Sequence, residues 1–209
     1  MNSVSNDRAT LSFIPSLFVK RFSHPWMPSL LHGSLGLGIF FLCLRARPDL
    51  LISNVLLVFA GMFLWTLIEY FLHRFVFHWV KVKQPWRDLA SGLHMAHHRT
   101  VDTEDLILAP PLTSLTFGAI IYLILLAFTW NFAFAGLLET GIFFGYIVYE
   151  WAHYSSHRYH PRSGLGKYLK HYHLQHHFKD PHRTFGVTSP LWDFVFGTHG
   201  SKNPNQARS

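Results

Sequence analysis

Four long apolar runs constrain the fold of this chain more than any other feature. They cover residues 30–44, 50–72, 112–130 and 132–149. A helix needs about 20 apolar residues to cross the hydrocarbon layer of a membrane. The first run is shorter than that, so we expect it to recruit residues 27–29 or to tilt. The runs predict an all-α integral membrane protein with four transmembrane helices.

The segments between the runs predict how the helices are connected. Arg45, Arg47, Pro48 and Asp49 separate the first two runs and are typical of a tight turn between antiparallel helices. Little more than Asn131 separates the last two runs, which therefore form either a hairpin or a helix bent deep in the membrane. Residues 1–10 are polar and lack the pattern of a cleaved signal peptide, so the first run is expected to belong to the mature protein.

The composition agrees with a membrane protein and excludes several other classes. Only 14% of the residues are charged, and phenylalanine occurs 20 times, which suits a surface that faces lipid. The single cysteine, Cys43, lies in an apolar run and can form neither a disulfide framework nor a thiolate metal site. The net charge of +7 arises from residues that flank the runs, so we expect contacts with lipid headgroups and none with nucleic acid. We expect residues 1–209 to form a single domain.

The basic residues predict an orientation. With four crossings, the N-terminus, residues 73–111 and the C-terminal tail share one side of the membrane. That side carries all of the 18 lysines and arginines except Arg45 and Arg47. The positive-inside rule makes it the cytoplasmic side.

Ten of the 16 histidines form four clusters on this predicted cytoplasmic side. Each cluster lies just beyond an apolar run or in its tail, and the clusters comprise His73 and His78; His94, His97 and His98; His153 and His157; His173, His176 and His177. Neutral imidazole is the commonest protein ligand of transition metals, and ten imidazoles exceed the needs of one ion. The clusters therefore predict two metal ions in a cytoplasmic, histidine-rich helical cap.

The spacing within the clusters favours ligands on helices. Each triplet has the pattern i, i+3, i+4, which places three imidazoles on one face of a helix, and His153 and His157 are an i, i+4 pair. Glu69 precedes His73 by four residues and is predicted to accept the second ring N–H of that ligand. His78 follows His73 by five residues, so it serves either a different metal or a locally unwound helix.

The remaining polar residues in and near the runs have simpler interpretations. We expect solvated or hydrogen-bonded side chains for six isolated histidines: His24, His32, His160, His171, His182 and His199. Glu139 has no histidine beside it and is interpreted as a polar contact between helices, whereas Glu150 lies three residues before His153 and favours a functional role. Trp26, Trp79 and Trp86 are predicted to lie at the membrane interface.

The sequences around the clusters resemble the fatty acid hydroxylase (sterol desaturase-like) superfamily. The segments that carry the resemblance are Glu-Tyr-Phe-Leu-His73-Arg-Phe-Val-Phe-His78, His94-Met-Ala-His97-His98 followed by Asp102 and Leu-Ala-Pro110-Pro111, Tyr149-Glu-Trp-Ala-His153-Tyr-Ser-Ser-His157 and His173-Leu-Gln-His176-His177-Phe. The closing Phe185-Gly-Val-Thr-Ser-Pro-Leu-Trp-Asp193-Phe-Val-Phe-Gly-Thr198 is similar to the fatty acid 2-hydroxylase branch. The resemblance extends over about residues 50–199.

The resemblance implies roles for individual residues. It implies that the ten clustered histidines are ligands of a dimetal centre, with four carboxylates as candidates to support them: Glu69, Asp102, Glu150 and Asp193. Glu150 stands where relatives are expected to have aspartate. The haem-binding cytochrome domain that is fused to many eukaryotic members is not found in these 209 residues. That difference implies a separate electron donor protein, and it favours a bacterial inner membrane over the endoplasmic reticulum.

The expected activity is hydroxylation of a fatty acyl chain with dioxygen, at the 2-position of a free or lipid-linked fatty acid. Iron is the ion that activates dioxygen toward an unactivated C–H bond, so two iron ions are expected, and zinc is a conceivable occupant after purification. One alternative is a sterol, carotenoid or alkane hydroxylase, or a desaturase, with the same metal core. Another is a membrane haem electron carrier or metal transporter, although a transporter is expected to place its ligands at mid-membrane.

Overall fold

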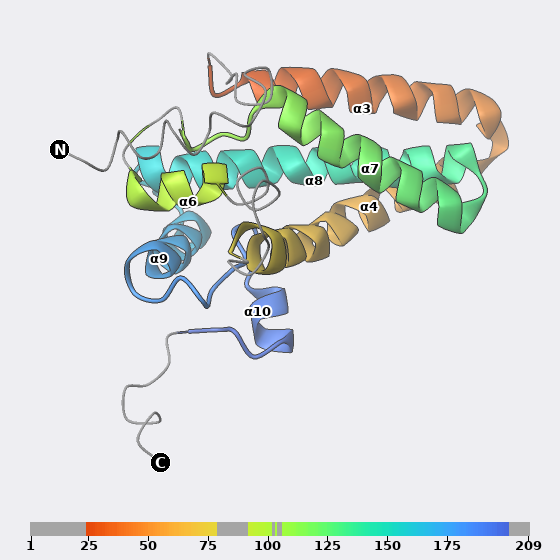
Figure 1. Ribbon diagram of the computed structural model, residues 1–209. Coiled ribbons are helices and arrows are strands. Elements are labelled where there is room, and N and C mark those ends of the chain that lie inside the picture. The colour runs from red at the N-terminus through yellow and green to blue at the C-terminus, as the bar shows by residue number, and fades with distance from the viewer. Residues whose placement is uncertain (1–23, 79–91, 102, 104–105, 201–209) are drawn as a thin grey trace. The chain divides into compact units, whose positions relative to one another are not determined.

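The structure is a computed structural model that describes residues 24–78, 92–101, 103 and 106–200, and the regular elements in these residues are all helices (Figure 1). They are α3 (Met27–Ala46), η2 (Pro48–Leu50), α4 (Leu51–Phe71), η3 (Leu72–Phe77), α6 (Gly92–Arg99), α7 (Pro111–Thr129), α8 (Phe132–Arg158), α9 (Gly164–Phe178) and α10 (Leu191–Val195). Four helical segments are long and apolar enough to cross a membrane: Met27–Ala46, Pro48–Phe77, Pro111–Thr129 and Phe132–Arg158. The predicted all-α membrane fold is confirmed, and α3 does include residues 27–29.

The contacts within the chain divide it into two compact units. Within the described residues, the first unit comprises 68–107 and 152–200 and carries the ten clustered histidines, so we call it the histidine unit. The second comprises 24–67 and 108–151, which hold most of the apolar helices, and we call it the span unit. The division falls inside α4 and α8.

Polar caps set both connections in the span unit. Asn54, which is fully buried, donates from Nδ2 to the Arg47 carbonyl at 2.9 Å and fixes the turn between α3 and α4. Between α7 and α8, Trp130 adopts a left-handed conformation with φ of 49°. The side-chain oxygen of Asn131 then accepts the backbone N–H groups of Ala133 and Phe134 at 3.1 and 3.0 Å, which caps the start of α8. The last two runs therefore form a helical hairpin.

Glycine lets α4 and α8 approach each other closely within the span unit. A Cβ atom on Gly61 of α4 would collide with the Leu138 carbonyl, and one on Gly141 of α8 would collide with the Val58 carbonyl. Helices in membranes associate chiefly through close packing of this kind, because lipid tails are as apolar as the side chains. The α4–α8 contact therefore depends on the absence of a side chain at Gly61 and Gly141.

Two interpretations of single polar residues have different outcomes. His32 is buried, and its Nδ1 lies 3.1 Å from the Pro28 carbonyl, as expected for a hydrogen-bonded side chain. Glu139 of α8, interpreted as a polar contact between helices, does face Gly118 of α7, but neither of its carboxyl oxygens has a hydrogen-bond partner among the described residues. Trp26 is about half exposed before α3, and Trp79 and Trp86 lie outside the described residues.

Enlarging Gly141 should separate α4 from α8. We expect Gly141→Leu to lower the free energy of unfolding by about 1–3 kcal/mol or more, because the new side chain must displace backbone atoms of α4. Thermal unfolding in detergent measures this effect. Gly38→Ala is the matched control, since a Cβ there meets nothing within 4 Å, and it should leave the melting temperature unchanged or raise it slightly. Equal melting temperatures for Gly141→Leu and the parent protein would contradict the close approach.

Candidate metal centre

The ten clustered histidines gather into two groups of five in the histidine unit. The first group is His73, His78, His94, His98 and His176, and the second is His97, His153, His157, His173 and His177. Within each group, the five candidate ligand nitrogens lie within 4.8 Å of one another. None of the six isolated histidines belongs to either group.

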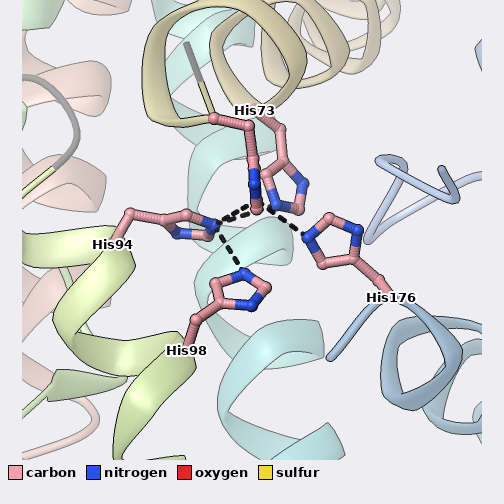
Figure 2. A group of neighbouring side chains, drawn as sticks. His73, His94, His98 and His176 are labelled. Carbon is pink, nitrogen blue, oxygen red and sulfur yellow. Dashed lines mark hydrogen bonds between the residues drawn. The ribbon is translucent and has the colours of Figure 1, made fainter. Parts of the chain in front are cut away.

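In the first group the Nε2 atoms converge on one point. Nε2 of His94 lies 3.1 Å from that of His73 and 3.0 Å from those of His78 and His98. Nε2 of His176 lies 2.9 Å from that of His78. Figure 2 shows His94 and His98 projecting from the same helix toward His73 and His176, which come from two other elements.

The second group has the same arrangement. Nε2 of His97 lies 3.1 Å from that of His153 and 3.2 Å from that of His157. Nε2 of His173 lies 2.9 Å from that of His157 and 3.0 Å from that of His177. Both groups thus present five imidazoles through the same ring nitrogen.

These separations match the spacing of ligands around a shared ion. Nitrogens bound about 2.05 Å from one metal lie roughly 2.9 Å apart at a right angle and roughly 3.3 Å apart at the tetrahedral angle. The observed Nε2–Nε2 distances of 2.9–3.2 Å fall within this interval. The donor set fits a transition metal in each group. All five donors of a group are imidazole nitrogens, and neighbouring Nε2 atoms lie as far apart as two ligands of one ion would.

Each triplet contributes to both groups. On α6, His94 and His98 belong to the first group and His97 to the second. On α9, His173 and His177 belong to the second group and His176 to the first. The i, i+4 pair of each helix therefore serves one group, and the residue between serves the other. This sharing ties the two groups together through the same two helices.

A π-helical turn brings His73 and His78 into one group. The turn η3 spans Leu72–Phe77, and the His78 N–H donates to the His73 carbonyl at 3.2 Å, an i to i+5 hydrogen bond. On an ordinary α-helix these residues would point roughly 140° apart. The wider turn aligns them, so the local unwinding considered from the sequence is present, and the two residues do not serve different groups.

Backbone carbonyls of one loop hold the outer ring nitrogens of two histidines. Nδ1 of His73 lies 2.5 Å from the Phe185 carbonyl, and Nδ1 of His176 lies 2.7 Å from the Arg183 carbonyl. A ring that donates its Nδ1–H to a carbonyl keeps its lone pair on Nε2, where a metal can bind it. Both rings belong to the first group. Sequence reasoning missed Phe185 and Arg183, because any residue type supplies a backbone carbonyl.

The prediction that Glu69 accepts the His73 ring N–H is wrong. Glu69 is buried, and its carboxylate accepts the N–H groups of Val187 and Thr188 at 2.6 and 2.9 Å and the Thr188 hydroxyl at 2.5 Å. A loop more than 100 residues later in the chain provides these partners, and spacing within one helix cannot reveal it. Glu69 therefore contacts the loop that holds His73 and not His73 itself.

Asp193 holds the same loop from its other side. This fully buried carboxylate accepts the N–H groups of Phe185 and Gly186 at 2.9 and 2.8 Å and the Thr198 hydroxyl at 2.6 Å. The hydrogen-bonded groups neighbour the Phe185 carbonyl that contacts His73. Asp193 and Glu69 thus fix four consecutive backbone N–H groups, those of residues 185–188.

The other two candidate carboxylates are in different positions. Glu150 belongs to the span unit, where its Oε1 accepts the Ala109 N–H at 3.3 Å. Asp102 lies outside the described residues. Among the isolated histidines other than His32, the described side chains of His24, His160, His171, His182 and His199 are exposed.

Burial keeps the clustered imidazoles neutral. Loss of solvent, with a smaller contribution from neighbouring imidazoles, lowers the pKa of His78 to about 2 and the pKa values of His97 and His98 to about 3. Burial likewise lowers the pKa of His176 to about 4, although its contact with the Arg183 carbonyl opposes the change. Neutral imidazole is the form that binds metals, so protons compete weakly for these nitrogens near neutral pH.

Comparisons with known proteins place this arrangement in a family. The chain is 38% identical to a dihydroceramide fatty acyl 2-hydroxylase from Arabidopsis thaliana, with 76% of this chain and 67% of the relative covered. It is 36% identical to the ceramide very long chain fatty acid hydroxylase of Saccharomyces cerevisiae, covering 67% of this chain and 37% of the relative. It is 33% identical to the fatty acid 2-hydroxylase of Homo sapiens, covering 71% of this chain and 41% of the relative.

A solved structure and a family profile agree with these relatives. The structure is described as full-length scs7p with only the hydroxylase domain visible. It matches with a TM-score of 0.79 at 29% identity, covering 92% of this chain and 72% of that one. The sequence profile of the fatty acid hydroxylase family matches residues 58–198, which include all ten clustered histidines. This chain therefore belongs to the fatty acid hydroxylase family.

Proposed function

We propose that this protein is a dimetal, dioxygen-dependent fatty acyl 2-hydroxylase of a membrane, with residues 1–209 acting as a single hydroxylase domain. The observation that carries the proposal is the pair of five-histidine groups in a chain of this family. The curated relatives are named as hydroxylases of fatty acyl chains, in ceramides or as fatty acids. We infer a substrate of the same class, a free or lipid-linked fatty acid.

The ten histidines would hold two iron ions, one in each group. Iron supplies the activation of dioxygen that insertion into an unactivated C–H bond requires. In the balanced reaction, one oxygen atom becomes the hydroxyl group on carbon and the other leaves as water, with two electrons from a separate donor protein and two protons from solvent. The chain's own contribution is to orient the imidazoles and exclude water, and the near-complete burial of His97, His173 and His176 supports this role.

Glu69 and Asp193 act as positioning residues in this proposal. They fix the loop of residues 185–188, whose Phe185 carbonyl accepts the Nδ1–H of His73. This contact selects the tautomer that presents the Nε2 lone pair to the metal. Glu150 and Asp102 are further candidates for supporting the centre.

The orientation in the membrane follows from the charges. The segments that contain the histidines carry most of the basic residues, which supports a cytoplasmic active site in a multi-pass membrane protein. The acyl chain would enter from the lipid, with its polar end near the histidine unit. We infer a location in a bacterial inner membrane or in the endoplasmic reticulum of a eukaryotic cell, since the four apolar helices suit either membrane.

The proposed reaction predicts a change in cellular lipids. Cells that express the protein together with a competent electron donor should accumulate acyl chains that are one oxygen atom heavier, with the hydroxyl group at carbon 2. His97→Ala should abolish this product, because it removes a ligand from the second group, whereas the exposed His171→Ala should retain it. Mass spectrometry of hydrolysed lipids measures the products. Unchanged lipids, or a product that has lost two hydrogens, would contradict acyl hydroxylation.

The proposed positioning role predicts weaker metal binding when Glu69 is removed. Glu69→Ala leaves the N–H groups of Val187 and Thr188 without their acceptor, so the loop should release His73, and the affinity for ferrous ion should fall about 10–100-fold. Anaerobic chelator competition measures this affinity without catalysis. Glu69→Gln keeps one acceptor oxygen and should recover part of it, and Asp49→Asn in the α3–α4 turn serves as a charge control. If Glu69→Ala bound metal as tightly as the parent protein, the positioning role would be refuted.

A further inference from the structure

The span unit contains a cavity that no step of the proposed hydroxylation uses. Its volume is about 680 Å³, it is partly open to the surface, and residues of α3, α7 and α8 line it. Figure 1 shows α7 crossing the face of α8 beside α3. The lining is almost entirely apolar and includes no histidine; Leu35 and Leu42 lie at its exposed edge, and Phe143 lies inside. A space of this size and character suits a small apolar or amphipathic molecule.

One carboxylic acid interrupts this apolar lining. Glu139 of α8 is only 1% exposed, and neither of its carboxyl oxygens has a hydrogen-bond partner among the described residues. On α7, Gly118 faces this acid, since a Cβ there would lie 3.3 Å from Oε1. The missing side chain brings the α7 backbone against the carboxyl group, whose two oxygens expose almost no surface.

A buried carboxyl group without a partner is costly within a membrane. Ionisable residues in membrane helices generally pair with another group or mark a ligand pathway. Arg45 also lines the cavity, but it is exposed and forms no ion pair with Glu139 in the described part of the chain. The acid therefore has no hydrogen-bond partner in the described part of the chain, and a ligand can supply one if the groups that cover its oxygens move.

We propose that this cavity binds a long-chain lipid alcohol, with its hydroxyl group on Glu139 and its hydrocarbon chain along the apolar lining. A hydroxyl group suits the acid in either protonation state: it donates to a carboxylate, and it both donates to and accepts from a neutral carboxyl group. The positive charge of Arg45 disfavours a cationic amine in the same cavity. A second carboxylate is disfavoured by the ionised form of Glu139.

Photocrosslinking tests this site directly. The probe is a 1-hexadecanol analogue with a diazirine in the middle of its chain, added to the purified full-length protein in detergent. We expect the label on peptides from the cavity-facing parts of α3, α7 or α8. Excess 1-hexadecanol should suppress labelling, whereas equal amounts of hexadecane or palmitic acid should not. Competition by hexadecane as strong as that by 1-hexadecanol, or stronger competition by palmitic acid, would overturn the assignment of an alcohol.

Variants separate the hydroxyl contact from simple partitioning into the helices. Glu139→Leu should reduce labelling about tenfold, as expected for the loss of one buried hydrogen bond, and Glu139→Gln should retain most of it. Phe41→Leu changes an exposed α3 residue outside the lining and should have no effect. Unchanged labelling in folded Glu139→Leu would refute the site.

A second variant keeps the test decisive if Glu139→Leu fails to fold. Ala119→Trp places a large side chain in the cavity at an exposed α7 position and leaves Glu139 intact. It should abolish labelling at the cavity while preserving the melting temperature. Persistent labelling of the same peptides in this variant would also refute the proposal.

Discussion

The convergence of ten neutral imidazoles is the constraint on which the rest of the histidine unit depends. Their Nε2 atoms approach to about 3 Å, and burial favours the neutral form that a metal requires. Five nitrogens can meet at one point only if their helices are held at fixed distances. Because α6 and α9 each contribute to both groups, a shift of either helix would disturb both.

Two local departures from regular structure make the convergence possible. The π-helical turn η3 aligns His73 with His78, which an ordinary α-helix would separate. The loop that begins at Arg183 contacts the outer nitrogens of His73 and His176, and Glu69 and Asp193 anchor that loop through its N–H groups. The two carboxylates thus position the histidines indirectly, because they hold the loop backbone whose carbonyls contact the imidazole rings.

The sequence predicted the features that arise from local pattern. Long apolar runs predicted the four membrane helices, and spacing identified all ten histidines that gather in the structure. The sequence could not assign each histidine to a group. The i, i+3, i+4 pattern places the three histidines of a triplet on one helix face, but it does not show that this face serves both groups. The sequence also could not predict the hydrogen-bond partners of Glu69, because Val187 and Thr188 belong to a loop far away in the chain. Nor could the sequence alone reveal the cavity that Glu139 lines.

The division of the histidines into two separate sites is the central claim, and counting bound metal tests it most directly. Anaerobic loading with ferrous iron should give two ions per chain. The double variant His94→Ala/His98→Ala should retain about one, held by the second group, and His173→Ala/His177→Ala should also retain about one, held by the first. One ion in the parent protein, or no loss of iron from either double variant, would contradict the two-site arrangement.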